Sequence, residues 1–244
     1  MTPLQIDCQL AGPWAPPSFG LHLDGLIAYA LVNRHVRAAD TSVNDYDEII
    51  ADLPFAKHEN GVWKASIFHP VGWLGQERRC LVAKTDTQHM SVLIEQGQVE
   101  AKGGSTIDTV RGIAKNAQVF FTIEHLHGLR AWCIGDADAI ADLLSDVTSI
   151  GIKTRMGFGA LQPYPDGSYW RVQACDGASV AWMRTSSPTQ LIAESYPAIG
   201  SWKPPYWRGS EQIFRPIPVR IAPDAPQTIA QSHQSGHDPL AALG

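Results

Sequence analysis

The order of apolar and polar positions divides the first part of the chain into a strand, a helix and a loop. Residues 4–10 alternate between the two kinds, which is the period-two pattern of a half-buried strand. Residues 22–35 repeat their apolar positions at helical spacing, which predicts an amphipathic helix. Its apolar face comprises Leu23, Leu26, Ile27, Ala30 and Leu31. Residues 41–60 are acidic and rich in turn formers, so we expect a surface loop with a short helix.

The middle of the chain is predicted to contain short strands around one long loop. Single strands are expected at residues 62–69, 79–84 and 91–95. A hairpin is expected from residues 118–126 and 129–134, with His127–Gly128 at its turn. Residues 96–117, between these groups, are polar and contain glycines. Long ordered loops inside compact domains are usually functional, so this one is a candidate binding element.

A second helix is predicted at residues 136–149, where Asp136 is suited to cap the first turn. A strand from about residue 158 to 162 follows, and the Pro-Asp-Gly turn at 165–167 leads into a strand at 169–175, which we expect to complete another hairpin. Prolines become frequent from residue 186 onward, and long periodicity fades.

This order of elements predicts an α+β fold of the ferredoxin-like (RRM-like) βαββαβ type, with inserted hairpins and a long thumb-like loop. Sheets of this type expose a face that proteins use for RNA. We expect residues 1–175 to form this domain and residues 176–222, rich in proline and tryptophan, to pack on it. Residues 223–244 are rich in Pro, Ala, Gln, Ser and His, which is typical of a flexible tail.

Composition narrows the class of protein. The 244 residues are 44% apolar and 18% charged, which are globular values, and no apolar run is long enough for a membrane span. The N-terminus lacks the basic start of a signal peptide, so we expect a cytoplasmic protein. The four cysteines are scattered and form no CxxC pair, so we expect reduced thiols. The net charge of −5 argues against non-specific nucleic-acid binding, but cations gather in residues 102–115, 151–173 and 202–220.

One of these basic segments is a glycine loop, GIKTRMGFGA at residues 151–160, between the second predicted helix and the next strand. Glycine lets a backbone approach phosphate closely, and successive amides can form an anion nest. Lys153 and Arg155 add positive charge at the same place. The loop lacks the Gly-Lys-Ser/Thr end of a Walker loop, and it follows a helix where a Rossmann loop follows a strand. On spacing alone, a tight connector with two surface cations is the competing interpretation.

This helix, glycine loop and strand resemble the glycine-rich loop of the CRISPR-associated RAMP superfamily. Residues 19–32, FGLHLDGLIAYALV, resemble the first helix of the backbone subunits that cap the 5′ handle of the guide RNA. Residues 104–115, GSTIDTVRGIAK, resemble a loop of the same subunits. The nearest likeness is the small RAMP subunit of type IV effector complexes, and it extends over most of residues 4–175.

The resemblance implies a subunit that caps the 5′ handle of crRNA and contacts the repeated backbone subunits and the large subunit of a DNA-targeting effector complex. It implies no cofactor and no membrane partner. It makes the glycine loop a candidate RNA-binding site, with Gly151, Lys153, Thr154, Arg155, Gly157 and Gly159. It also makes the long loop a thumb against the RNA, with Lys102, Arg111 and Lys115.

Residues 196–215 interleave aromatic and basic side chains, which suits stacking and backbone contacts to nucleic acid. The candidates for contact with target DNA near the protospacer-adjacent motif, or with a partner subunit, are Trp202, Lys203, Tyr206, Trp207 and Arg208. The alternative is a proline-rich segment that packs its tryptophans over the main domain.

Catalysis is a weaker hypothesis than binding. Some RAMP relatives process precursor RNA, and His22 at the start of the first helix is the candidate general base, with a local structural role as the alternative. A small ferredoxin-like enzyme that binds an anionic substrate is a third interpretation. We expect no metal site, since His125 and His127 lack a third ligand at suitable spacing. Asp138, Asp142 and Asp146 are expected to form a solvated helix face or to meet a basic partner.

Overall fold

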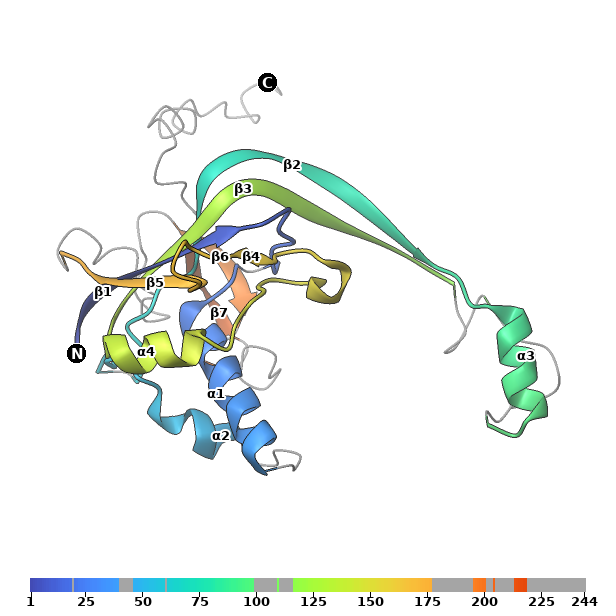
Figure 1. Ribbon diagram of the computed structural model, residues 1–244, viewed down its shortest axis with the longest axis horizontal. Coiled ribbons are helices and arrows are strands. Elements are labelled where there is room, and N and C mark those ends of the chain that lie inside the picture. The colour runs from blue at the N-terminus through green and yellow to red at the C-terminus, as the bar shows by residue number, and fades with distance from the viewer. Residues whose placement is uncertain are drawn as a thin grey trace, which may run out of the picture.

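The computed structural model describes residues 1–18, 20–39, 46–59, 61–98, 109, 116–176, 195–200, 204 and 213–218. It has an α+β fold built on a curled antiparallel sheet, which confirms the predicted class (Figure 1). The strands of this sheet are β1 (Thr2–Leu10), β2 (His69–Ala83), β3 (Ala117–Gly135), β4 (Leu161–Gln162) and β5 (Trp170–Ala174). They run in the order β2-β3-β1-β4, and β5 also pairs with β1.

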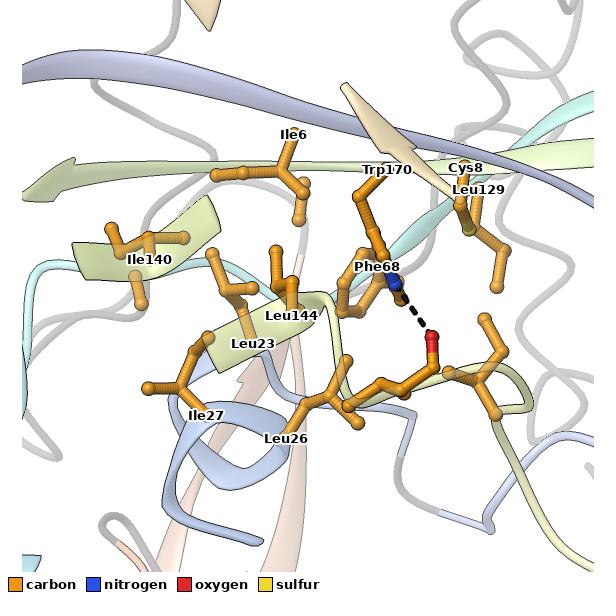
Figure 2. Packing of buried hydrophobic residues seen from close by; sticks show 14 of the residues in the cluster. Ile6, Cys8, Leu23, Leu26, Ile27, Phe68, Leu129, Ile140, Leu144 and Trp170 are labelled. Carbon is orange, nitrogen blue, oxygen red and sulfur yellow. Dashed lines mark hydrogen bonds between the residues drawn. The ribbon is translucent and has the colours of Figure 1, made fainter. Parts of the chain in front are cut away.

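Two helices cover one face of this sheet, α1 (Leu23–Ala39) and α4 (Ala137–Leu144) (Figure 1). Strand β1 alternates as predicted and buries its Leu4, Ile6, Cys8 and Leu10 side chains. Figure 2 shows Ile6 and Cys8 facing the apolar side chains of the two helices, and the Trp170 indole donates a hydrogen bond of 2.8 Å to the Val147 carbonyl. The predicted helix 22–35 is therefore confirmed and extends to Ala39.

Helix α4 begins where the sequence predicts. The Asp136 carboxylate accepts the amides of Asp138 and Ala139 at 3.1 Å each, so the predicted N-cap is confirmed. The helix ends at Leu144, earlier than predicted. Two further short elements, α2 (Tyr46–Ile49) and η1 (Ile50–Asp52), lie in the segment predicted as a loop with a short helix.

The longest departure from the predicted strands is a ribbon formed by β2 and β3. Strand β3 runs unbroken over 19 residues, so the predicted turn at His127–Gly128 is wrong. Gly128 pairs with β1, and a Cβ there would lie 2.2 Å from the Cys8 carbonyl oxygen. A glycine is needed here because the two strands approach too closely for a side chain. From sequence alone, a glycine required by such packing looks the same as a glycine in a turn.

Other middle-chain predictions also change. Strand β2 covers residues 79–83 of the predicted strand 79–84, but it takes in only His69 of the predicted strand 62–69. Trp63, Ala65 and Ile67 make isolated bridges, such as that of Ala65 with Cys133. The predicted short strand 91–95 is wrong, because these residues belong to helix α3 (Thr87–Glu95) at the far end of the ribbon (Figure 1). The Asp86 side chain caps this helix by accepting the Gln88 and His89 amides.

The predicted hairpin of residues 158–162 and 169–175 is also wrong. Strands β4 and β5 follow one another along the same edge of β1, where Gln9 pairs with Gln162 and Cys8 with Trp170. The chain between them loops out through the predicted Pro-Asp-Gly turn, which the Tyr164 amide closes by donating to the Ser168 carbonyl at 2.7 Å. The two strands therefore each pair with β1, one after the other, and do not form a hairpin with each other.

The C-terminal part contains an antiparallel pair that the sequence did not predict. Strand β6 (Ser195–Gly200) pairs with β7 (Ile213–Pro218), so part of the predicted extension 176–222 is a β-hairpin. Pro204, between them in sequence, is buried. The predicted tail 223–244 lies outside the described residues, and the proposed domain boundaries remain predictions.

Candidate nucleic-acid interface

The glycine loop joins α4 to β4 and is held rigidly against the segment after β1. A Cβ on Gly151 would lie 2.4 Å from the Trp14 indole nitrogen and 2.5 Å from the Ala15 carbonyl oxygen. A Cβ on Gly159 would lie 1.9 Å from the Ile150 carbonyl oxygen. Both glycines also have positive φ, +94° and +69°, which disfavours any other residue. These two glycines are therefore required by packing within the chain.

Backbone hydrogen bonds fix the same loop from both ends. The Ile152 amide donates to the Ala15 carbonyl at 2.8 Å, and the Gly159 amide donates to the Pro13 carbonyl at 2.8 Å. The Gly157 amide closes a short turn by donating to the Thr154 carbonyl at 2.9 Å. The expectation that glycine amides in this loop are available to an anion is therefore wrong for Gly157 and Gly159. At Gly157 and Gly159 the backbone amides are engaged within the chain, so Lys153 and Arg155 become the main candidates for contact with a ligand.

Those side chains gather on and beside η2 (Thr154–Met156), a single turn in the middle of the loop. Lys153 precedes it in the left-handed region, with φ of 61°, and Gly157 follows it with open space where a Cβ would stand. Arg155 is exposed, whereas Lys153 and Thr154 are half-buried. Among the described residues, neither cation forms an ion pair. Two uncompensated positive charges therefore sit on a rigid support.

The loop also contacts the base of the ribbon, through Phe158. Its ring meets that of Phe121 on β3 edge-on, with centroids 5.5 Å apart. Side chains on one face of a strand recur every second residue, and paired residues of an antiparallel ladder share a face. We call the ribbon face that carries Phe121 the inner face; it comprises Glu77, Arg79, Leu81, Val119, Phe121, Ile123 and His125.

A third cation stands on this inner face, close to the loop. Arg79 pairs across the ribbon with Phe121, and its guanidinium donates to the Glu77 carboxylate at 2.7 Å. The His125 ring lies 3.3 Å from the same carboxylate. The hydrogen bond from Arg79, aided by that from His125, lowers the pKa of Glu77. Sequence reasoning missed Arg79 and Phe121, because only the register of β2 and β3 brings them to the loop.

The opposite face of the sheet carries compensated charges. Arg130 donates to Asp7 at 2.6 Å across neighbouring strands. Arg171 donates to Asp166 at 2.6 Å and lies over the Tyr164 ring at 4.3 Å. The hydrogen bond from Arg171, with those from Ser168, lowers the pKa of Asp166 well below its usual range. Cations held by neighbouring acids attract a phosphate chain weakly, so the glycine loop is the stronger candidate.

Two groups of predicted site residues lie outside the described residues. Lys102, Arg111 and Lys115 belong to the segment that connects α3 to β3. Trp202, Lys203, Tyr206, Trp207 and Arg208 belong to the segment between β6 and β7. Their contribution to the interface stays a prediction.

The histidine proposed as a general base is not at this surface. His22 is only 5% exposed, and its backbone bridges that of Ile67. A base that activates a ribose hydroxyl must reach it within hydrogen-bond distance, which a buried imidazole cannot do without a rearrangement. No group of three or more histidine, cysteine or carboxylate side chains suited to a metal ion occurs among the described residues.

The acidic run on α4 has a partner within the chain. Arg34 of α1 donates to the side chains of Asp142 and Asp146 and to the Asp142 carbonyl, the last at 2.8 Å. These bonds tie the two helices together, while Asp138, Asp142 and Asp146 all remain exposed, as predicted for a solvated helix face. None of the helices in the described parts of the chain is long and apolar enough to cross a membrane.

Comparison with known proteins identifies the family. A family model described as "CRISPR type IV associated protein Csf3" matches residues 2–218, from β1 to the end of β7. No curated protein matches the chain. The match extends over nearly the whole sequence and confirms the type IV resemblance of the glycine loop and the first helix. The chain belongs to the family of CRISPR type IV associated protein Csf3.

Proposed function

We propose that this protein is a non-catalytic subunit of a type IV CRISPR effector complex that binds guide RNA and caps its 5′ handle. The observation that carries the proposal is the rigid glycine loop with Lys153 and Arg155 uncompensated by any described acid. Arginine binds phosphate through paired N–H groups and lysine as a mobile charge, so a sugar-phosphate chain is the fitting ligand.

We infer a ferredoxin-like domain of the RAMP type as the scaffold. The strand order β2-β3-β1-β4 supports this, with α1 between β1 and β2 in sequence and α4 between β3 and β4. In that arrangement the glycine loop enters the last strand next to the ribbon base. Phe121 and Phe158 then provide an apolar wall beside the loop that carries Lys153 and Arg155, which suits an RNA whose bases are splayed from its backbone.

The guide RNA test uses the complete complex with its partner subunits, because the net charge of −5 predicts weak binding by the isolated chain. In the Lys153→Ala/Arg155→Ala double variant, affinity for the 5′ handle RNA should fall, and the slope of log K against log salt should decrease by about 1.4, or about 0.7 per phosphate contact. Arg37→Ala removes an exposed-helix cation and is the matched control. An unchanged salt slope in the double variant would reject the proposal.

The endoribonuclease alternative makes a different prediction in the same complex. Labelled repeat RNA in EDTA should be bound and not cut, because the buried His22 is poorly suited to act on it. Cleavage that disappears in His22→Ala would replace the binding role with a processing role. No RNA affinity in the complete complex would favour the third hypothesis, an enzyme for a small anionic substrate.

Contact with target DNA near the protospacer-adjacent motif remains part of the proposal through Lys203 and Arg208. Tryptophans can stack on bases, and the neighbouring cations can read base edges. If Lys203→Ala/Arg208→Ala leaves DNA binding by the complete complex unchanged, this segment does not take part.

A further inference from the structure

The ribbon formed by β2 and β3 has a second face whose chemistry differs from that of the inner face. We call it the outer face; its exposed residues are Trp73, Gln76, Arg78, Cys80, Val82, Gln118, Phe120 and Thr122. Glu124, paired with Gln76, and Leu126, paired with Trp73, also lie on this face but are buried. The inner face has three charged or titratable side chains in Glu77, Arg79 and His125, whereas on the outer face Glu124 is buried and Arg78 is the one exposed charged side chain. The proposed RNA contacts occupy the inner face only, so the outer face is left without a role.

Its apolar side chains are unusually exposed. Trp73 and Phe120 are each 51% exposed, and Val82 is 54% exposed. Figure 1 shows the ribbon leaving the body of the molecule toward α3, with neither α1 nor α4 beside its outer half. A two-stranded ribbon is marginally stable alone in water, and a row of exposed aromatic and branched side chains marks a binding surface.

Arg78 decides what kind of surface this is. Its guanidinium lies 4.5 Å from the centre of the Phe120 ring, and among the described residues it has no carboxylate partner. Aromatic residues and arginine are enriched at the centres of protein interfaces, and Lys, Glu and Asp are depleted there. The outer face has this composition.

We propose that the outer face of the ribbon docks a protein partner that presents an apolar surface with an acidic side chain opposite Arg78. This rests on the proposed function, in that the partner would be another subunit of the effector complex. Residues 73–82 extend over about 30 Å of strand, at about 3.3 Å per residue, which is the length of a helix of about 20 residues. An apolar helix laid along the ribbon would therefore cover the whole face.

Charge argues against two other occupants. A nucleic-acid strand is held by cations along its phosphates, and one arginine in about 30 Å is too few. A second copy of this chain could stack its outer face on this one about a two-fold axis. With the axis at the centre of the face, the two Arg78 side chains would meet, and like charges disfavour that contact. A hetero-partner with a carboxylate satisfies both constraints.

The test removes apolar area and charge from the outer face separately, in the co-expressed complex. The variants are Phe120→Ser/Val82→Thr, Arg78→Glu and the conservative Arg78→Lys. Val92→Ser is the matched control, since Val92 is 45% exposed but lies on α3. Size-exclusion chromatography measures the fraction of partner protein retained, and circular dichroism checks folding. Light scattering and RNA affinity are measured on the isolated chain, the latter at low salt, where weak electrostatic binding to RNA is strengthened.

We expect Phe120→Ser/Val82→Thr and Arg78→Glu each to lower the affinity for the protein partner about tenfold, the scale of a single interface hot spot. Arg78→Lys and Val92→Ser should retain the partner, and RNA affinity should not change. Unchanged partner retention in the folded variants would overturn the proposal. A loss of RNA affinity, or a dimer of the isolated chain that Phe120→Ser/Val82→Thr abolishes, would assign the face to RNA or to a second copy and would also overturn it.

This outcome can be separated from the outcome for guide RNA. If Lys153→Ala/Arg155→Ala leaves RNA binding intact while the outer-face variants release the partner, the proposed RNA contacts fail and the docking surface stands. The reverse pattern rejects the docking surface alone.

Discussion

Phe158 of the glycine loop packs edge-on against Phe121 of β3, with their ring planes inclined by 76°. The two residues lie far apart in sequence, and their contact fixes the loop relative to the base of the ribbon. Aromatic pairs of this geometry contribute about 0.5–1.5 kcal/mol beyond the area they bury. The positions of Lys153 and Arg155 relative to Arg79 therefore depend on this pair.

Removing the Phe158 ring should weaken RNA binding without removing any charge. We expect Phe158→Ala to keep the fold, to lower the free energy of unfolding by about 1–3 kcal/mol, and to lower RNA affinity of the complex several-fold. The reason is that, without the Phe158–Phe121 contact, Lys153 and Arg155 are no longer held in one position relative to the ribbon. Urea denaturation and fluorescence anisotropy measure the two effects, with Phe158→Leu as the control that keeps apolar bulk. Wild-type RNA affinity in Phe158→Ala would show that the contact does not position the cations.

The glycines of the loop should differ in their tolerance of alanine. A Cβ on Gly159 would strike the Ile150 carbonyl oxygen at 1.9 Å, so the backbone must move, and we expect Gly159→Ala to cost at least about 3 kcal/mol. Gly157 has nothing within 4 Å of a Cβ, so Gly157→Ala should cost only about 1 kcal/mol for its positive φ. Urea denaturation of the two variants compares these values. Equal losses would mean that the packing of Gly159 against Ile150 is not what makes glycine necessary.

The Glu77 carboxylate should titrate below its ordinary range, since the hydrogen bond from Arg79 lowers its pKa. Its contribution to folding is then present above the unfolded pKa of about 4.3 and is lost as pH falls through the lower folded pKa. We expect Arg79→Ala to raise the Glu77 pKa toward its usual value, as followed by NMR titration of the carboxyl carbon. The control is Arg78→Ala on the other face of the ribbon, which should leave Glu77 unchanged. A Glu77 pKa that is the same in Arg79→Ala and wild type would contradict this ion pair in solution.

The cysteines should react with thiol reagents in an order set by burial. Desolvation raises the pKa of the buried Cys8 thiol, while Cys80 on the outer face of the ribbon is exposed. Because the thiolate is the reactive form, we expect maleimide to label Cys80 first and to label Cys8 only as the protein unfolds. Peptide mass spectrometry over time measures the order, and labelling in urea provides the fully accessible reference. In the assembled complex, protection of Cys80 is expected if a partner covers the outer face.

Local pattern was sufficient where local interactions decide the structure. The alternation of residues 4–10 predicted β1, and the helical spacing of residues 22–35 predicted α1, because burial of one face fixes the period of each. Asp136 predicted the start of α4, since an N-cap is made within one turn of chain. The glycine loop was found by composition, and the family to which the chain belongs was recognised from the loop together with the first helix.

Tertiary structure alone decided which contacts the residues of those segments make. Gly128 resembled a turn residue, but its lack of a side chain serves the approach of β3 to Cys8, which no local pattern specifies. The amides of Gly157 and Gly159 looked available to an anion, but they bond to Thr154 and Pro13. Arg79 joins Lys153 and Arg155 only through the register of β2 and β3 and the contact between Phe121 and Phe158. The sequence by itself determined which residue types and which periods the chain offers, because these follow from each residue and its near neighbours. Strand pairing and packing decided which of them meet, because those free energies depend on residues more than 30 positions apart.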